Sequence, residues 1–182
     1  YDMDAYIQED GTIHIDESIT YYFSSSANGL TRDLRYFYKT NKDSMEPNSA
    51  RYQATGIENI TVAVTNPANI TTNFTKASNA EKGDNGVYTV DAVNADRTDG
   101  YDIMVYSPIS SNNFQTVHYS YDITDAVVQY NDMSEIYYNF IGNGIETDVD
   151  EFNLDIYLPK SINMDDVKYY PHTYATKLED IQ

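Results

Sequence analysis

Apolar side chains alternate with polar ones from the first residue of the chain. The alternating apolar positions of the first 23 residues are Tyr1, Met3, Ala5, Ile7, Ile13, Ile15, Ile19, Tyr21 and Phe23. A period of two is typical of a half-buried strand, and Asp10-Gly11 between the two runs is a hairpin turn signal. Glu17 interrupts the apolar face of the second run. The pattern predicts a long antiparallel hairpin.

Short runs of the same kind continue along the chain and predict further strands. They cover residues 60–64, 70–74, 87–93, 101–105, 114–123, 135–141 and 152–158, with a last edge strand over 167–170. Residues 40–54 are polar, contain Pro47 and show no periodicity, which predicts a long loop. Helix and strand patterns compete over residues 125–130, where we expect a short helix with Asp125 as its N-cap.

The composition supports an all-β fold. The chain has 182 residues, and its apolar content is rich in aromatic and β-branched side chains, including 19 Tyr and 6 Phe. Such side chains suit a pleated, half-buried surface better than a helix. We therefore expect an antiparallel β-sandwich of about ten strands with one short helix near residues 125–130. No linker or fixed-period repeat is present, which predicts a single domain over residues 1–182; the alternative is a split into two domains within residues 40–54.

The charge of the chain narrows the range of partners. The formal net charge is −18, from 29 acidic and 11 basic residues. Nucleic-acid phosphates and anionic lipid headgroups repel so negative a surface, which argues against nucleic-acid binding. Solubility explains the charge, as does the binding of a cation or a cationic partner. The chain has no cysteine, which excludes disulfides, zinc–thiolate sites and cysteine nucleophiles.

Two groups of carboxylates are the candidate metal sites. They are Asp91, Asp96, Asp99 and Asp102, and Asp148, Asp150, Glu151 and Asp155. Oxygen-rich loops can hold calcium, which takes roughly six to eight oxygen ligands, but neither group has the spacing of a calcium-binding loop. A solvated charged edge is the simpler interpretation, so we expect no cofactor. The same two regions are where a carbohydrate-active enzyme would place a pair of carboxylates between tyrosines.

The histidines give no sign of catalysis. His14, His118 and His172 are far apart in the sequence and lack the spacing of metal ligands. No G-x-S-x-G motif is present to mark a nucleophilic serine, although the members of a Ser-His-Asp triad meet only in space. No catalytic residue is predicted.

Adjacent tyrosines and three sequons point to the surface. In a strand, the pairs Tyr21-Tyr22, Tyr137-Tyr138 and Tyr169-Tyr170 would each place one ring in the core and one outside. The N-x-[ST] sequons begin at Asn59, Asn69 and Asn73, and they fit an outer surface if the source glycosylates exported proteins.

Five groups of residues follow one another in a characteristic order. They are Asp10-Gly11 with Glu17, Ile19, Thr20, Tyr21 and Phe23; Gly29-Leu30-Thr31-Arg32-Asp33-Leu34; Tyr119-Ser120-Tyr121-Asp122-Ile123 with Ala126-Val127 and Asp132; Glu135-Ile136-Tyr137-Tyr138-Asn139-Phe140-Ile141-Gly142; and Phe152, Leu154, Ile156, Leu158 and Pro159. Together they resemble the extracytoplasmic N-terminal region of a family of predicted membrane proteins of bacteria and archaea, domain of unknown function 2207. Within them, Arg32-Asp33 could form a ligand-facing ion pair, but we favour a structural role in which Arg32 pairs with a carboxylate or caps a loop.

The resemblance implies a location and an architecture but no catalytic residues. It implies a fragment of a longer membrane-anchored protein, outside the cytoplasm and tethered by segments beyond these residues. We expect a non-catalytic binding or scaffolding role in the cell envelope, with a protein or glycan partner at the cell surface. The alternatives are an envelope carbohydrate-active enzyme and a calcium-stabilised adhesin module.

Overall fold

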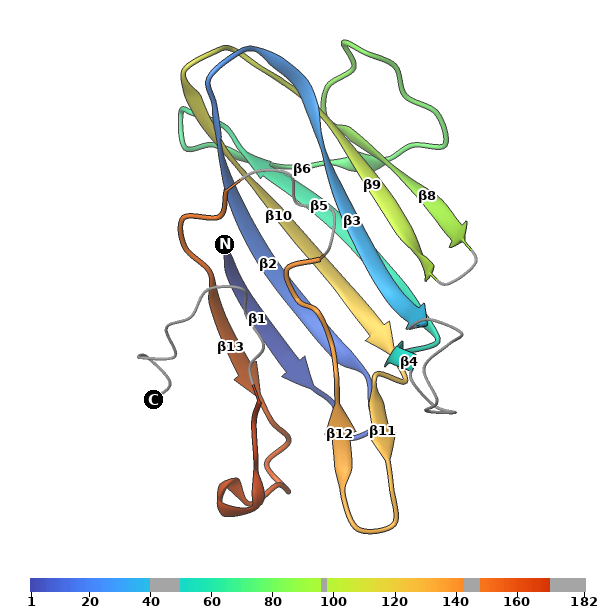
Figure 1. Cartoon of the computed structure of the whole chain (residues 1–182). Coiled ribbons are helices and arrows are strands. Elements are labelled where there is room, and N and C mark those ends of the chain that lie inside the picture. The colour runs from blue at the N-terminus through green and yellow to red at the C-terminus, as the bar shows by residue number, and fades with distance from the viewer. Residues whose placement is uncertain (40–49, 96–97, 143–147, 171–182) are drawn as a thin grey trace.

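Two β-sheets face each other across a common core (Figure 1). The computed structural model describes residues 1–39, 50–95, 98–142 and 148–170. The six-stranded sheet has the order β13-β1-β2-β10-β5-β6, formed by β1 (Asp2–Ile7), β2 (Ile13–Phe23), β5 (Gly56–Thr65), β6 (Thr71–Asn73), β10 (Asn113–Thr124) and β13 (Asn153–Tyr157). The five-stranded sheet has the order β4-β3-β9-β8-β7, formed by β3 (Ala27–Lys39), β4 (Ala50–Gln53), β7 (Thr75–Lys76), β8 (Val87–Ala95) and β9 (Thr98–Ile109).

The predicted all-β sandwich is confirmed, but its strands are not all antiparallel. β13 pairs parallel with β1, and β7 pairs parallel with β8. A small separate hairpin joins β11 (Val127–Gln129) to β12 (Ser134–Ile136), and one 3-10 turn, η1, covers Met164–Asp166. Among the described residues, no helix is long and apolar enough to span a membrane.

The alternating side chains of the first hairpin form the centre of the core. β1 and β2 pair antiparallel as predicted, and Gly11 in the turn has a φ of 87°. Ile13, Ile15 and Ile19 are fully buried and lie beside the inward side chains of β10. The Tyr88 hydroxyl donates to the carbonyl oxygen of Ile60 at 2.8 Å and so links the two sheets. The apolar half of the pattern thus fills the space between the sheets.

The helix expected over residues 125–130 is wrong. Asp125 has a left-handed backbone with a φ of 52°, and the amides of Ala126 and Val127 donate to the carbonyl oxygen of Gly11 at 3.0 and 3.2 Å. The turn directs the chain into β11, where the β-branched Val127 and Val128 pair with β12. These non-local hydrogen bonds outweigh the capping tendency of Asp125.

Two further expectations about the elements are corrected. The predicted edge strand at residues 167–170 is irregular, so Tyr169 and Tyr170 are both exposed and do not divide between core and surface. The tyrosines of the other two pairs divide as predicted, since Tyr22 and Tyr137 are exposed while their neighbours pack on the core. The loop predicted over residues 40–54 contains β4; residues 40–49 lie outside the described part of the chain.

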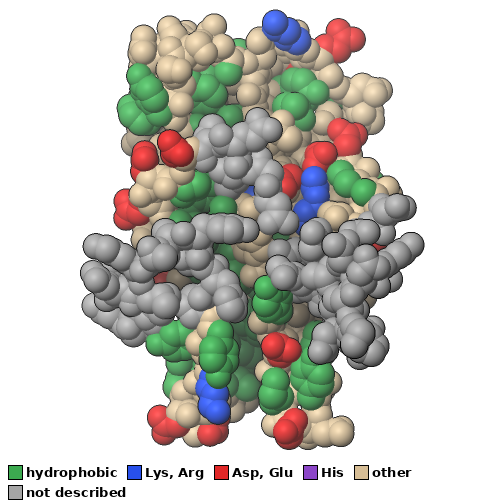
Figure 2. All heavy atoms as spheres, in the orientation of Figure 1, with side chains coloured by type: hydrophobic (Ala, Val, Ile, Leu, Met, Phe, Trp, Pro, Cys, Tyr) green, Lys and Arg blue, Asp and Glu red, His purple; other side chains and the backbone are tan. Residues whose placement is uncertain are grey.

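Exposed apolar side chains gather at one end of the molecule. Tyr130 and Met133 lie at the tip of the β11–β12 hairpin, and Ile162 and Met164 lie beside η1. Both segments project at the lower end in Figure 1, and the corresponding end of Figure 2 carries hydrophobic side chains interspersed with acidic ones.

Candidate functional site

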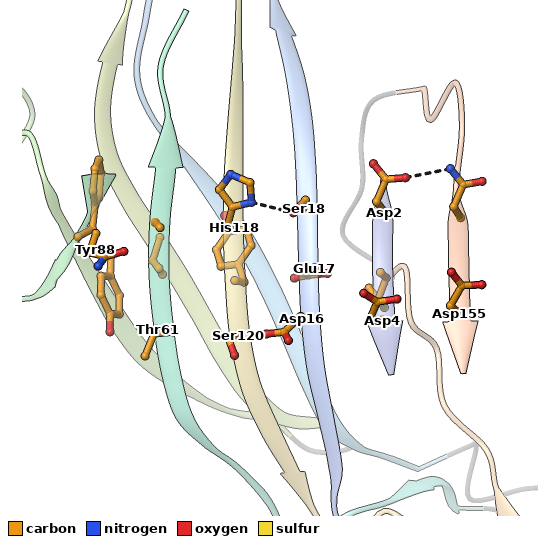
Figure 3. A pocket seen from close by; sticks show the side chains of 17 residues that line it. Asp2, Asp4, Asp16, Glu17, Ser18, Thr61, Tyr88, His118, Ser120 and Asp155 are labelled. Carbon is orange, nitrogen blue, oxygen red and sulfur yellow. Dashed lines mark hydrogen bonds between the residues drawn. The ribbon is translucent and has the colours of Figure 1, made fainter. Parts of the chain in front are cut away.

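The outer face of the six-stranded sheet contains a hollow of about 780 Å³ (Figure 3). Its outward-pointing side chains include Asp2, Asp4, Asp16, Ser18, His118 and Asp155, and we refer to it as the hollow. Glu17 and Tyr119 also border it, but they point into the core and are 2% and 1% exposed. The polar half of the strand pattern lines the outward side of the hollow, and the inward apolar side chains of Met3, Val62, Phe74 and Tyr88 also border it.

Three carboxylates lie in one row across the hollow. Asp155 of β13 pairs in register with Asp4 of β1, and Asp4 pairs in register with Asp16 of β2. Asp2 adds a fourth carboxylate one step along β1, where it accepts a hydrogen bond from the Asn153 amide at 2.9 Å. No Lys or Arg is among the described residues that line the hollow. Like charges directly opposite one another destabilise a sheet, so this row lowers the stability of the free protein.

Two aromatic pairs flank the polar rows on the same face. Tyr6 and Tyr157 stack with ring centroids 4.7 Å apart and an interplanar angle of 11°. Tyr22 and Phe114, at the opposite end of β2 and β10, have centroids 4.9 Å apart and are 56% and 60% exposed. The negative charge of Asp4 is the main cause that raises the pKa of the Tyr157 phenol above its ordinary value. Tyr22, Phe114 and Tyr157 thus expose aromatic ring surface on this face.

His118 connects four strands by hydrogen bonds. Its Nδ1 lies 2.7 Å from Ser18 Oγ and its Nε2 lies 2.8 Å from Thr65 Oγ1, which in turn lies 2.7 Å from Thr71 Oγ1. A Ser-His contact is part of a catalytic triad, but in a triad a carboxylate holds the other ring nitrogen and stabilises the imidazolium. Here an uncharged threonine holds that nitrogen. The contacts link β2, β10, β5 and β6 and do not form a triad.

His14 forms a second polar group beside the aspartate row. Its Nδ1 lies 2.6 Å from Asp122 Oδ1 and its Nε2 lies 3.5 Å from Asp16 Oδ1. The Asn59 amide donates to Asp122 Oδ2 at 2.6 Å from a left-handed backbone with a φ of 53°. Although partial burial acts to raise it, hydrogen bonds from Asn59 and His14 hold the pKa of Asp122 below its ordinary value. The side-chain amide of Asn59, the first residue of a sequon, is therefore already hydrogen-bonded to Asp122.

The structure does not bring the two predicted carboxylate groups together. Asp91, Asp99 and Asp102 belong to β8 and β9 of the five-stranded sheet, whereas Asp148, Asp150 and Glu151 precede β13 and Asp155 lies within it, in the six-stranded sheet. Asp102 pairs with Arg35 Nη2 at 2.6 Å. In the described ranges, no group of three or more His, Asp or Glu side chains is placed to hold a metal ion. Asp96 and His172 lie outside these ranges, and calcium binding stays a prediction.

Arg32 pairs with a carboxylate, as its structural interpretation expected. The partner is Glu17, the residue that interrupts the apolar face of β2, and both side chains are almost completely buried. Arg32 Nε and Nη2 donate to the two oxygens of Glu17 at 2.9 Å each. The pair joins the two sheets inside the core and is not open to a ligand.

Sequence reasoning named Asp155 as a candidate metal ligand but missed the other acidic residues of the hollow. Asp2, Asp4, Asp16 and Ser18 occupy the polar positions of the first hairpin, and only its apolar positions were interpreted. The strict alternation of aspartate with Met3 and Ala5 was the available signal, because it places acidic side chains on one outward face.

Comparison with known proteins gives one match. The family model described as Predicted membrane protein (DUF2207) N-terminal domain matches residues 1–181. Neither the curated proteins nor the solved structures give a match.

Proposed function

We propose that this chain, which belongs to the family of DUF2207 N-terminal domains of predicted membrane proteins, is a non-catalytic binding domain outside the cytoplasm. In this proposal the domain is tethered to the membrane by other parts of the protein. Its ligand is a cationic protein segment that binds in the hollow on the six-stranded sheet.

The unbalanced charge of the hollow is the observation that carries the proposal. Four aspartates line it without a Lys or Arg among the described lining residues. A segment with Lys or Arg side chains would relieve the repulsion among Asp155, Asp4 and Asp16 as it binds. The acidic hollow would also steer such a segment during encounter, so association should slow as salt is added.

The stacked tyrosines support the same ligand class. Tyr6 and Tyr157 lie one step along the strands from the aspartate row. An ammonium or guanidinium group is attracted to the face of an aromatic ring, and a nearby carboxylate adds its own Coulomb attraction to the same cation. The rim of the hollow thus combines the two groups that bind cationic side chains.

A decalysine peptide tests the proposal. We expect calorimetric titration to show binding at about 20 mM NaCl that weakens strongly at about 500 mM. Asp4→Asn with Asp155→Asn should weaken binding by about fivefold or more, because it removes two of the four carboxylates. The matched control is Asp91→Asn with Asp148→Asn, which removes the same charge outside the hollow. Equal weakening by both pairs would mean that net charge, not the hollow, binds the peptide.

Labelling of intact cells tests the side of the membrane. The domain has no cysteine, so Lys82→Cys in an exposed turn introduces one defined thiol. We expect a membrane-impermeant maleimide to label this variant of the full-length protein in intact cells, relative to the parent protein. Labelling that requires permeabilised cells would place the domain in the cytoplasm.

The carbohydrate-active enzyme has less support. The described members of one proposed carboxylate region lie on the five-stranded sheet, whereas Asp155 of the other lies on the six-stranded sheet, so the two regions do not face each other across one cleft as a glycosidase pair would. Binding to a neutral glycan in place of decalysine would favour this class of ligand over a cationic one.

A further inference from the structure

Residues 137–142, which we call the strap, are fastened to the core by Arg32. Arg32 Nη1 donates to the carbonyl oxygen of Ile141 at 2.8 Å, and Nη2 donates to that of Phe140 at 3.0 Å. Together with Glu17 and the carbonyl oxygen of Asp33, these acceptors satisfy all five N–H groups of the guanidinium. One buried side chain therefore joins β2, β3 and the strap.

Gly142 makes this attachment specific. Its φ is 91°, and a Cβ atom at this position would lie 2.9 Å from Arg32 Nη1. Any other residue would be strained in the backbone and would push against the guanidinium. The Asn139 side chain also accepts a hydrogen bond from the Gly142 amide at 3.2 Å, which closes the end of the strap.

The strap precedes the strand that forms one wall of the hollow. Ten residues separate Gly142 from Asn153, where β13 begins. β13 is an edge strand that pairs only with β1, and it contributes Asn153, Asp155 and the stacked Tyr157 to the hollow and its rim. Edge elements with few partners open at lower free energy than central strands. When the strap is held, the free connection to β13 is the ten residues after Gly142; when it is detached, the connection is longer and its closure costs more entropy, so holding the strap favours the docked strand.

We propose that Arg32 is a positioning residue for the hollow: by holding the strap, it keeps β13 docked along β1. Detachment of the strap would let β13 separate while the central strands stay paired. The hollow would then lose its Asp155 wall and the Tyr157 ring. A hollow without these groups would bind its ligand more weakly, and this effect on binding is the only consequence that rests on the proposed function.

Hydrogen exchange measured by mass spectrometry tests the proposal. The variant is Gly142→Ala, which disturbs Arg32 Nη1 and leaves Glu17 unchanged. The matched control is Gly83→Ala, because Gly83 also has a positive φ, 104°, but no atom lies within 4 Å of an added Cβ. We expect Gly142→Ala to speed exchange about tenfold in the strap and in β13, and to leave β9 and β10 unchanged. Gly83→Ala should leave all four segments unchanged.

Two outcomes of this experiment would overturn the proposal. One is faster exchange in the strap with wild-type exchange in β13, since the strap would then not hold the strand. The other is equally faster exchange in β9 and β10, since Arg32 would then support the whole sandwich.

Decalysine binding separates this inference from the proposed function. If the wild-type protein binds the peptide, Gly142→Ala should weaken binding severalfold; faster exchange in β13 with unchanged binding would overturn the positioning role. If the wild-type protein does not bind it, the cationic ligand is wrong, and the exchange data alone decide whether Arg32 keeps β13 in place.

Discussion

The Tyr119 hydroxyl is buried without a hydrogen-bond partner among the described residues. Burial is the main cause that raises its pKa well above the ordinary value, and the nearby Tyr21 and Glu17 add to the effect. The Tyr88 hydroxyl, also in the core, donates to the carbonyl oxygen of Ile60. A buried hydroxyl without a partner keeps its desolvation cost, whereas a bonded one recovers it.

We therefore expect opposite effects from the same atomic deletion at the two tyrosines. Tyr119→Phe should raise the free energy of unfolding by about 1 kcal/mol, and Tyr88→Phe should lower it by about 1 kcal/mol. Urea denaturation followed by circular dichroism measures both. A loss of stability in Tyr119→Phe would show that a buried water satisfies this hydroxyl in solution.

At the scale of elements, the left-handed turn at Asp125 decides between strand and helix. Its side chain accepts a hydrogen bond from Thr55 Oγ1 at 2.7 Å, and its φ of 52° starts the path into β11. A residue with a Cβ atom loses about 1 kcal/mol in this conformation, and glycine does not.

Substitutions at Asp125 should follow this backbone preference. Both Asp125→Ala and Asp125→Gly lose the contact with Thr55, but the alanine variant should be less stable than the glycine variant by about 1 kcal/mol. Urea denaturation of the two variants gives the difference directly. A more stable alanine variant would mean that the turn had converted to the helix suggested by the local pattern.

The elements that could be predicted are those specified by neighbouring residues. Alternation and the Asp10-Gly11 turn predict the first hairpin, since pairing partners there are close in the chain. The β11 strand was predicted as a helix because its decisive hydrogen bonds come from Gly11, more than a hundred residues away. Parallel pairing of β13 with β1 is equally non-local, and no local pattern specifies it.

The candidate site shows the same difference between local contacts, which the sequence predicts, and distant contacts, which it does not. The hairpin register alone places Asp4 opposite Asp16, so two members of the acidic row were within reach of the sequence. Asp155 joins them only through β13. The contacts of His118 with Ser18 and Thr65 likewise need three strands to meet. Sequence predicts which side chains face outward, but the partners across a sheet depend on topology.

At the scale of the whole molecule, the net charge of −18 affects both the stability of the folded protein, through self-repulsion, and its attraction to cationic partners. The described surface carries acidic side chains on both sheets: the described lining of the hollow has no Lys or Arg beside its aspartate row, whereas Asp102 on the other sheet pairs with Arg35. The difference between the faces, more than the total charge, is the reason that the hollow is the proposed binding face.

Alkaline pH should unfold the whole sandwich, because its core is built on tyrosines. Burial is the largest cause that raises the pKa values of Tyr21, Tyr119 and Tyr121 above the ordinary 10.0. A group with a raised folded pKa contributes stability that is complete below its unfolded pKa and is lost as pH rises beyond it. Above pH 10.0 each of the three tyrosines should therefore lower the free energy of unfolding by about 1.4 kcal/mol per pH unit. Together they should lower it by roughly 4 kcal/mol per pH unit.

We expect one cooperative transition above pH 10, in which tyrosinate absorbance appears as the β-sheet circular dichroism signal disappears. Tyr119→Phe removes one of the three linked protons, so its transition should begin at higher pH and be less steep; Tyr22→Phe, at an exposed ring, should leave the transition unchanged. Tyrosinate formation by the buried tyrosines before any loss of sheet signal would contradict this account. It would mean that the sandwich opens locally to hydroxide without unfolding.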